Sequence, residues 1–329
     1  MIIVLFLIAT ILQSSYGQIS LTGSQLSEFG YDSSSTVISL SGADISDIAP
    51  GAFDGFPNVQ VIDLSYNSIS SIDGNSFRGL SQLTTLTLSN TYINSIADNT
   101  FTGLANLEYL DLWDCYLESI NAQVFKGLRK LTFLDLNYNV LGYIEDNAFA
   151  DLESLQVLFI NQNYIDNLNV NTFRGLRNLQ VLDLYDNFIE TLPSNVFSEA
   201  KSLMIIDLYY NTLSSITSTT FKGLTELLDL DMGFNPLQGI PANAFSDLAK
   251  LEILDITYAY LYDLNPSQFA GLVSLYELKI DTADITSVAA NTFCDSRASL
   301  RFLDLAFNYI EFVEADAFSC LKELLYLGK

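Results

Sequence analysis

Leucine recurs every 24 residues through most of the chain, and this fixed spacing limits the possible folds more than any other feature. If this leucine is position 1 of a unit, Val59 and Ser35 extend the series upstream and Leu300 continues it after one inserted residue. The sequence therefore predicts a repeat domain over residues 35–329, with twelve full units and a partial unit that begins at Leu324. The recurring leucines are Leu83, Leu107, Leu131, Leu155, Leu179, Leu203, Leu227, Leu251 and Leu275.

Each unit has apolar residues at positions 1, 4, 6, 11, 14 and 19, and position 19 is phenylalanine in every full unit. The alternation around positions 4 to 6 is typical of a short β-strand. One unit of this length cannot bury its own apolar side chains, whereas stacked units bury a continuous core. Because stacked strands lie about 4.8 Å apart, each position of the unit should form a column along the molecule.

Position 9 is asparagine in most units, and Cys115 replaces it in one of them. A buried turn leaves backbone N–H and C=O groups that need partners, and an amide side chain supplies both donors and an acceptor. We therefore predict a structural column at position 9. Cysteine is small and tolerates burial, so Cys115 should be an inert, inward-facing member. The predicted column is Asn67, Cys115, Asn139, Asn163, Asn187, Asn211, Asn235 and Asn308.

The pattern L-x-x-L-x-L-x-x-N-x-I-x-x-I-x-x-x-x-F-x-G-L-x-x resembles the 24-residue leucine-rich repeat of extracellular proteins. This is the kind found in secreted immune and adhesion proteins and in Toll-like ectodomains. The resemblance covers residues 35–329. It implies an α/β solenoid, a leucine-rich repeat horseshoe with a concave parallel β-sheet and a mostly irregular or short-helical convex side. It also implies a role in recognition rather than catalysis.

The two ends of the chain lead to separate predictions. Residues 1–17 contain an apolar run from Ile2 to Leu12, followed by the small residues Ser15 and Gly17, and this order predicts a secretory signal peptide. An uncleaved anchor or a buried strand is the alternative. Residues 18–34 contain no cysteine and are predicted to cap the first unit by packing. The chain stops within an expected strand, so either it is part of a longer protein or another chain, such as a second copy, covers this edge.

Cys294 and Cys320 lie in successive units, both on the predicted convex side. A disulfide requires Cα atoms about 4.4 to 6.8 Å apart, which neighbouring turns can provide. The sequence leaves two readings open, a disulfide between these cysteines or two free thiols.

The chain has a formal net charge of −25 and no histidine. Such a surface repels nucleic-acid phosphates and anionic membranes, and it favours basic partners. Without histidine the chain lacks the commonest general base and metal ligand. We predict no catalytic residues, no cofactor, no metal site and no membrane insertion within the given chain. Calcium binding by aspartates is disfavoured because no local loop of oxygen ligands is present.

Positions 2, 3, 5, 7 and 8 should face solvent on the concave sheet. Acidic residues greatly outnumber basic ones there, and Lys279 and Arg301 are the only cations. Aspartate dominates position 5, and exposed tyrosine or tryptophan among acids is typical of protein-recognition surfaces. The predicted ligand-binding residues are Tyr109, Asp111, Trp113, Phe133, Asp135, Tyr138, Phe159, Asp183, Tyr185, Asp207, Tyr209, Asp231 and Asp255.

These features predict a secreted, non-catalytic recognition protein that binds a basic protein ligand on its concave face. Two alternatives remain open. The chain is a truncated ectodomain of a membrane receptor of the Toll-like or adhesion type, or it is a carrier subunit of an extracellular complex.

Overall fold

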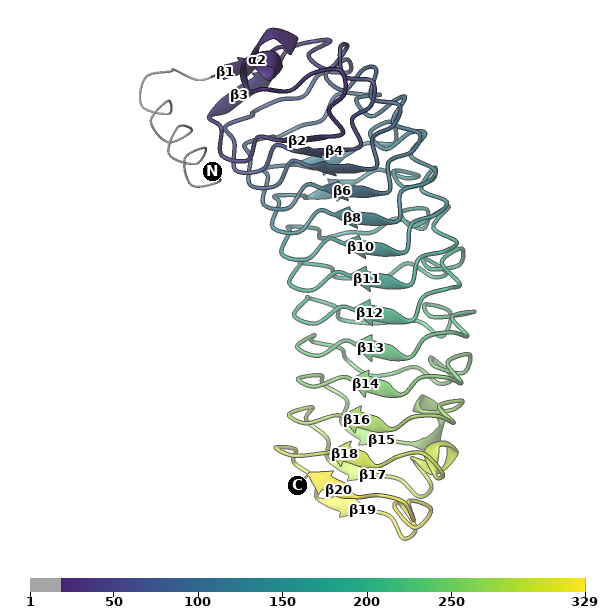
Figure 1. The fold of residues 1–329 in the computed structure, drawn as a ribbon. Helices are drawn as coiled ribbons and strands as arrows, with labels where there is room; N and C mark the ends of the chain where they lie inside the picture. The colour runs from purple at the N-terminus through teal and green to yellow at the C-terminus, as the bar shows by residue number, and fades with distance from the viewer. Residues whose placement is uncertain (1–18, 329) are drawn as a thin grey trace.

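A computed structural model describes residues 19–328, and its main feature is one parallel sheet of 13 strands that runs the length of the stack (Figure 1). The predicted α/β solenoid of the leucine-rich repeat type is confirmed. The predicted signal peptide, residues 1–17, lies outside the described residues. In spatial order the strands are β2 (Val37–Ser39), β4 (Val61–Asp63), β5 (Thr85–Thr87), β6 (Tyr109–Asp111), β8 (Phe133–Asp135), β10 (Val157–Phe159), β11 (Val181–Asp183), β12 (Ile205–Asp207), β13 (Asp229–Asp231), β14 (Ile253–Asp255), β16 (Glu277–Lys279), β18 (Phe302–Asp304) and β20 (Tyr326–Gly328).

Neighbouring strands pair without any shift between equivalent positions of the units. Tyr109 lies opposite Phe133, and Asp111 lies opposite Asp135. In most strands the central residue is fully buried, as Leu110 is, while its two neighbours are partly exposed. Side chains of a strand alternate between its two faces, so positions 3 and 5 share the outer face of the sheet in every unit.

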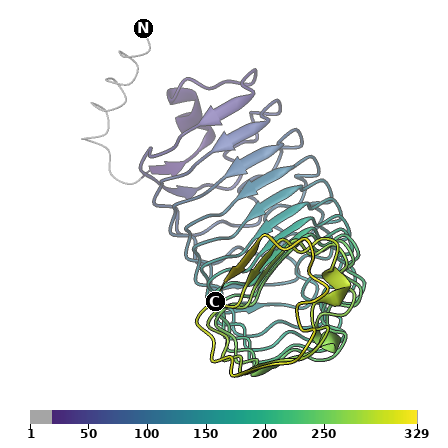
Figure 2. The ribbon, with the colours of Figure 1, turned by 90° about the horizontal axis from the view of Figure 1, so that it is seen from below.

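The other side of each turn is mostly irregular, as Figure 2 shows in a view from one end of the stack. It contains short strands that pair in small sheets and two 3-10 helices, η1 (Pro266–Gln268) and η2 (Cys294–Ser296). The short strands are β7 (Ser119–Ile120), β9 (Tyr143–Ile144), β15 (Asp263–Leu264), β17 (Ser287–Val288) and β19 (Phe312–Val313).

The phenylalanines of position 19 form a spine inside the solenoid, with ring contacts in three runs, Phe53 to Phe149, Phe173 to Phe245 and Phe269 to Phe318. Phe53 and Phe77 stack with ring centroids 6.1 Å apart, and Phe173 and Phe197 are 5.7 Å apart. All of them except Phe318, which is partly buried, are at most 2% exposed. Removing one such ring from a packed core costs about 3–5 kcal/mol, so this column is a main source of stability.

The asparagines of position 9 form a buried column of amides. Asn163 donates through Nδ2 to the carbonyl oxygens of Leu136, Ile160 and Asn161, at 3.0 to 3.1 Å. Its Oδ1 accepts the N–H of Leu141 at 3.0 Å. Each amide therefore joins its own turn to the preceding unit. The same pattern holds for Asn67, Asn139, Asn187, Asn211, Asn235 and Asn308.

Cys115 occupies the same column and is 2% exposed. Its Sγ donates to the carbonyl of Leu88 at 3.4 Å, the same relative position to which the asparagines donate. Burial, together with the nearby charges of Asp111 and Asp114, raises the pKa of the Cys115 thiol to about 11. The thiol is thus protonated at neutral pH and poorly nucleophilic.

A short cap precedes the first unit. β1 (Ile19–Leu21) pairs in parallel with β3 (Ile45–Ile48), and α2 (Gly23–Glu28) begins with a capping box in which Thr22 and Gln25 bond reciprocally. Leu21 and Leu26 are fully buried. The hydroxyl of Tyr31 donates to the carbonyl of Ser39 at 2.8 Å and accepts its N–H at 3.0 Å, which satisfies part of the free edge of β2.

Near the other end of the stack, Cys294 and Cys320 are joined by a disulfide, with their Cα atoms 5.5 Å apart. The bond links two successive turns on the convex side. It closes a loop in the last described units, where the phenylalanine spine is less deeply buried.

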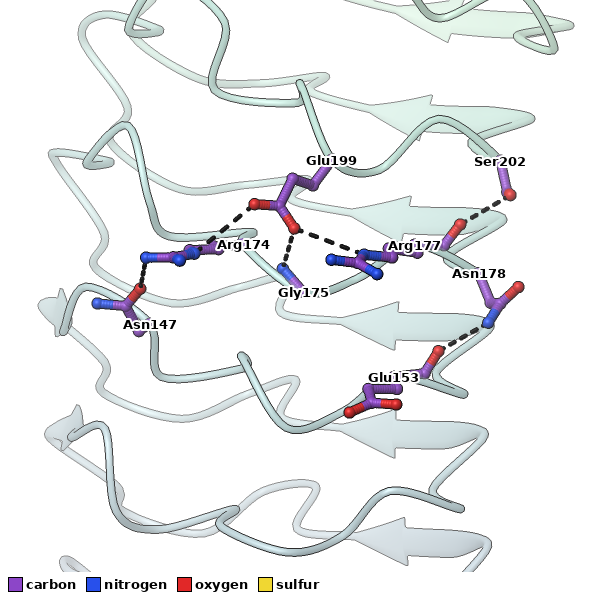
Figure 3. Close-up of polar contacts among 8 residues, drawn as sticks. All are labelled: Asn147, Glu153, Arg174, Gly175, Arg177, Asn178, Glu199 and Ser202. Atoms are coloured by element: carbon purple, nitrogen blue, oxygen red, sulfur yellow. Dashed lines mark hydrogen bonds and ion pairs between the residues drawn. The ribbon is translucent and has the colours of Figure 1, made fainter.

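From the fourth unit to the eleventh, position 21 alternates between glycine and an acidic residue. Gly175 has φ +90°, and a Cβ there would lie 2.4 Å from the carbonyl oxygen of Ala150, so only glycine fits. Its N–H donates to Glu199 in the next unit, which also contacts Arg174 and Arg177 (Figure 3). The glycine-to-acid pairs are Gly127 to Asp151, Gly175 to Glu199, Gly223 to Asp247 and Gly271 to Asp295.

Candidate recognition surface on the concave sheet

The aspartates of position 5 lie at the end of each strand and hold the turn that follows. Asp111 Oδ1 accepts the N–H of Trp113 at 2.9 Å, and the arrangement resembles an Asx turn. Each carboxylate is therefore fixed by its own backbone. The same bond, at 2.9 to 3.0 Å, is made by Asp63, Asp135, Asp183, Asp207, Asp231, Asp255 and Asp304.

These carboxylates form a column of like charges, the Asp column, that is only partly open to water. Most are partly exposed, but Asp255 is 7% exposed, so the prediction that it faces solvent is wrong. It is covered because its Oδ1 bonds the N–H of Thr257 and the amine of Lys279 lies 3.3 Å from its Oδ2. Neighbouring carboxylates about 5 Å apart repel by about 0.8 kcal/mol even in bulk water, and more near protein.

Three members of the Asp column have pKa values far above the ordinary value for aspartate. Burial, reinforced by the charges of Asp111 and Asp183, raises the pKa of Asp135 to about 6. Burial and the charge of Asp183 raise the pKa of Asp207 to about 6. Burial and the adjacent Asp255 raise the pKa of Asp231 to about 7. The charge of this surface therefore changes close to neutral pH.

Lys279 is the one cation in the Asp column. It replaces aspartate at position 5 of β16, and its Nζ lies 3.3 Å from Asp255 and 3.6 Å from Glu277. Burial lowers the pKa of Lys279, but Asp255 and Glu277 together raise it more, so the amine stays charged. It neutralises part of the column at its C-terminal end and leaves the stretch from β6 to β12 without a cation.

Aromatic side chains accompany the column over β6, β8 and β10. Tyr109 and Phe133 stack with centroids 4.6 Å apart, and Phe159 meets Phe133 edge-on at 5.5 Å. Trp113 packs edge-on against Tyr138 at 5.8 Å. Most of these rings are partly buried by one another, whereas Tyr138 is 49% exposed. They form a continuous apolar strip beside the carboxylates.

A second aromatic cluster lies over β11 to β14. Tyr185 and Tyr209 stack at 5.7 Å, Tyr209 lies 4.9 Å from Phe234, and Phe234 lies 4.0 Å from Tyr258. Gly233 leaves room beside this cluster, because a Cβ there would lie 2.8 Å from Thr257 Oγ1, 3.0 Å from Asp255 Oδ1 and 3.1 Å from the ring of Tyr209. Tyr210, Phe234 and Tyr258 were not among the predicted site residues.

These three residues all occupy position 8, where the backbone has φ between 54° and 61°, a conformation that bulky residues seldom adopt. The position-8 N–H donates to the carbonyl of position 7 in the next unit, as Tyr210 does to Gly233 at 3.0 Å. The fold thus imposes the strained conformation and turns the side chain outward. The sequence feature that could have identified Tyr210, Phe234 and Tyr258 as surface residues is the recurrence of aromatic residues at position 8.

Residues 35–285 match a profile of the leucine rich repeat family in six overlapping segments, 35–93, 81–141, 137–189, 153–212, 177–237 and 229–285. The chain belongs to the leucine-rich repeat family. No curated protein matches the chain in a sequence search.

Several solved leucine-rich repeat structures resemble this one. A TLR13–ssRNA13 complex contains a chain with 26% identity and a TM-score of 0.67, over 85% of this chain and 44% of that one. The Drosophila Toll–Spatzle complex gives 19% identity and a TM-score of 0.78, over 97% of this chain and 48% of that one. A Leptospira interrogans leucine-rich repeat protein gives 23% and 0.71, over 87% of this chain and 72% of that one. The chain spans about half the length of the first two.

The cations of this leucine-rich repeat chain are concentrated away from the concave sheet. Apart from Lys279, Arg301 and the terminal Lys329, every lysine and arginine lies at positions 20 to 24, just before a strand begins. Several pair there with acids of the neighbouring unit, as Lys250 does with Glu226 at 2.6 Å. Within residues 19–328 no group of three or more His, Cys, Asp or Glu side chains is arranged to hold a metal ion.

Proposed function

We propose that this leucine-rich repeat protein is a non-catalytic, extracellular recognition protein that binds a protein ligand with a basic surface. The concave strip over β6 to β14, in which aromatic rings adjoin the Asp column, is the proposed binding surface. The observation that supports this most is the combination of stacked rings with carboxylates and a single lysine. Rings provide area that is buried at low entropic cost, and carboxylates favour cationic partners.

The charge of the strip favours a protein ligand over a nucleic acid. One of the similar structures is a Toll–Spatzle complex and another is a TLR13–ssRNA13 complex, so both ligand classes occur on related folds. A chain with a formal charge of −25 and a carboxylate column on its sheet repels phosphates. We therefore assign the concave surface to a basic protein.

The proposed location is outside the cell, either secreted or at the cell surface. Its supports are the predicted signal segment and the likeness to Toll and TLR13. In the described part of the chain no helix has the length and apolar character needed to cross a bilayer. If the chain is instead a receptor ectodomain or a carrier subunit, the proposed binding surface and the proposed mode of binding are the same.

Affinity capture from extracellular fluid tests this function. The chain would be compared with a variant in which Tyr109, Trp113 and Tyr138 are changed to alanine, and with a control variant in which Lys126 and Arg129 are changed to alanine. Quantitative mass spectrometry should show basic proteins retained by the wild-type and control chains, lost with the concave variant, and released as salt rises. Equal recovery by all three chains, or capture that does not respond to salt, would contradict the assignment.

A further inference from the structure

A second column of aromatic residues lies outside the concave strip. It occupies position 10, directly after the buried Asn column, and includes Tyr92, Tyr116, Tyr164 and Phe188. Each backbone N–H in this column bonds the position-11 carbonyl of the preceding unit, as Tyr116 does to Ile93 at 3.1 Å and Tyr164 to Leu141 at 2.9 Å. The backbone therefore fixes these side chains at regular intervals along one flank of the solenoid. We call them the flank column.

The rings of the flank column are paired and open to solvent. Tyr92 and Tyr116 stack with centroids 5.6 Å apart, and Tyr164 and Phe188 stack at 5.9 Å. The four residues are between 49% and 58% exposed, unlike most of the rings of the concave strip. The hydrophobic core does not need them there. Exposed rings that are stacked in pairs and held rigidly provide ready-made faces for a partner.

The surroundings of the flank column carry only negative charge. Exposed acids stand two residues after its rings at Glu118, Asp166 and Glu190, and Asp114 and Asp186 stand two residues before. No lysine or arginine occurs anywhere in positions 6 to 19 of any full unit. A second copy of this chain would bring another strongly acidic body to the surface. The complementary partner is therefore cationic.

We propose that the flank column binds an extended, arginine-rich segment of a partner protein, with guanidinium groups stacked on the tyrosine rings. In an extended chain, every second side chain points the same way and recurs at about 6.8 Å. Because the rings of each pair stack on one another at 5.6 Å or 5.9 Å, guanidinium groups would contact the outer faces and edges of a pair, which long arginine side chains can reach from an extended backbone. Arginine stacks on aromatic faces more readily than lysine does, and neighbouring carboxylates add a long-range attraction. The inference does not depend on the concave assignment.

A peptide of alternating arginine and serine is the probe, and its affinity is measured by fluorescence anisotropy at low and physiological salt. A variant with Tyr92, Tyr116 and Tyr164 changed to leucine keeps the apolar area and removes the rings. It should bind about tenfold more weakly. The matched variant with the same three residues changed to phenylalanine keeps the rings and should bind within about twofold of the wild type. An unchanged affinity in the leucine variant, or an equal loss in the phenylalanine variant, overturns the proposal.

Cross-linking on the wild-type chain locates the peptide without relying on variants. A photoreactive group at the centre of the probe should label residues of positions 10 to 13, and mass spectrometry of the digest identifies them. Labels confined to the concave strip overturn the flank assignment and leave the proposed function standing. A variant with Tyr109 and Tyr209 changed to leucine separates the two surfaces further, because it should leave binding of this peptide unchanged. Loss of peptide binding in that variant would place the peptide on the concave strip and overturn the flank assignment.

Discussion

Two columns of polar side chains, the Asn column and the Asp column, run along the solenoid. They have opposite effects on stability, because one satisfies buried backbone groups and the other brings like charges together. In the Asn column, each amide satisfies up to four backbone groups and carries no charge. In the Asp column, each carboxylate accepts one backbone N–H, and Asp207 and Asp231 face a like charge in both neighbouring units. A neutral amide that both donates and accepts hydrogen bonds can be buried in one unit after another without electrostatic repulsion. Stacked charges repel one another, so the bond from each carboxylate to the turn that follows it is made against a cost that the Asn column does not carry.

The largest effect should come from the Asn column. Changing Asn163 to alanine leaves the buried N–H of Leu141 without a partner and removes one of the bonds accepted by the carbonyls of Leu136, Ile160 and Asn161. The free energy of unfolding should therefore fall by about 2–4 kcal/mol. Urea denaturation followed by circular dichroism measures it. Asn178, an exposed residue that donates to Glu153, is the matched control, and its change to alanine should cost less than about 1 kcal/mol. If both substitutions lower the free energy of unfolding equally, the buried amide of Asn163 is no more important for stability than the exposed amide of Asn178.

The Asp column should make the protein more stable in mild acid. Folding raises the pKa values of Asp135 and Asp207 to about 6 and that of Asp231 to about 7, above the value of about 3.9 in an unfolded chain. The folded state then binds more protons between about pH 4 and pH 7, and the free energy of unfolding rises as pH falls through this window. The gain should be about 1–3 kcal/mol, since the groups are coupled and partly screened. Thermal melts at pH 7.5 and pH 5 would show it, and a lower melting temperature at pH 5 would contradict it.

Removing one charge from the Asp column should reproduce part of that gain at neutral pH. Asp231→Asn keeps an oxygen for the N–H of Gly233 and relieves repulsion with Asp207 and Asp255, so it should stabilise the protein by about 1 kcal/mol at pH 7.5. The advantage should disappear at pH 5, where the wild-type carboxyl is protonated. If the variant is more stable than the wild type at both pH 7.5 and pH 5, the added stability comes from packing and not from the loss of charge repulsion. Affinity for a basic ligand should fall in the same variant.

The smallest effect should come from charges outside the columns. Lys250 and Glu226 form an ion pair at 2.6 Å, with both side chains at least half exposed. Lys250→Met should change the free energy of unfolding by less than about 0.5 kcal/mol. Chemical denaturation at low and high salt is the measurement. A loss above about 1 kcal/mol would show that the outer ion pairs, and not the buried columns, hold neighbouring units together.

Repetition made the fold predictable from the sequence, because each column appears many times and averages out local exceptions. The period, the phenylalanine spine and the strand positions all follow from apolar spacing. The surface was less predictable, because one residue type can hydrogen-bond to the backbone and also be exposed to solvent. Position 5 is recognisable as aspartate, yet its bond to the N–H of position 7, and the burial of Asp255, depend on a turn that the apolar pattern does not specify.

The flank column and the aromatics of position 8 illustrate the same limit. Position 8 was predicted to face solvent, but the left-handed backbone that turns Tyr210 and Phe234 outward does not follow from the apolar pattern. Tyr116, adjacent to Cys115 in the sequence, belongs to a different surface from Trp113, only three residues earlier. Which neighbours in sequence share a surface is decided by the path of the turn.

The alternation at position 21 affects how a chain of this kind can change length. The N–H of Gly175 donates to Glu199, at position 21 of the next unit, and the backbone of Ala150 in the preceding unit lies too close to Gly175 for a side chain. Glu199 in turn accepts this bond from the glycine of the preceding unit. Within units four to eleven, deleting one unit would set two like forms against each other, whereas deleting two adjacent units would keep each glycine before an acid. The chain is therefore expected to tolerate gain or loss of material by even numbers of units, so that its natural module for duplication or engineering is the pair.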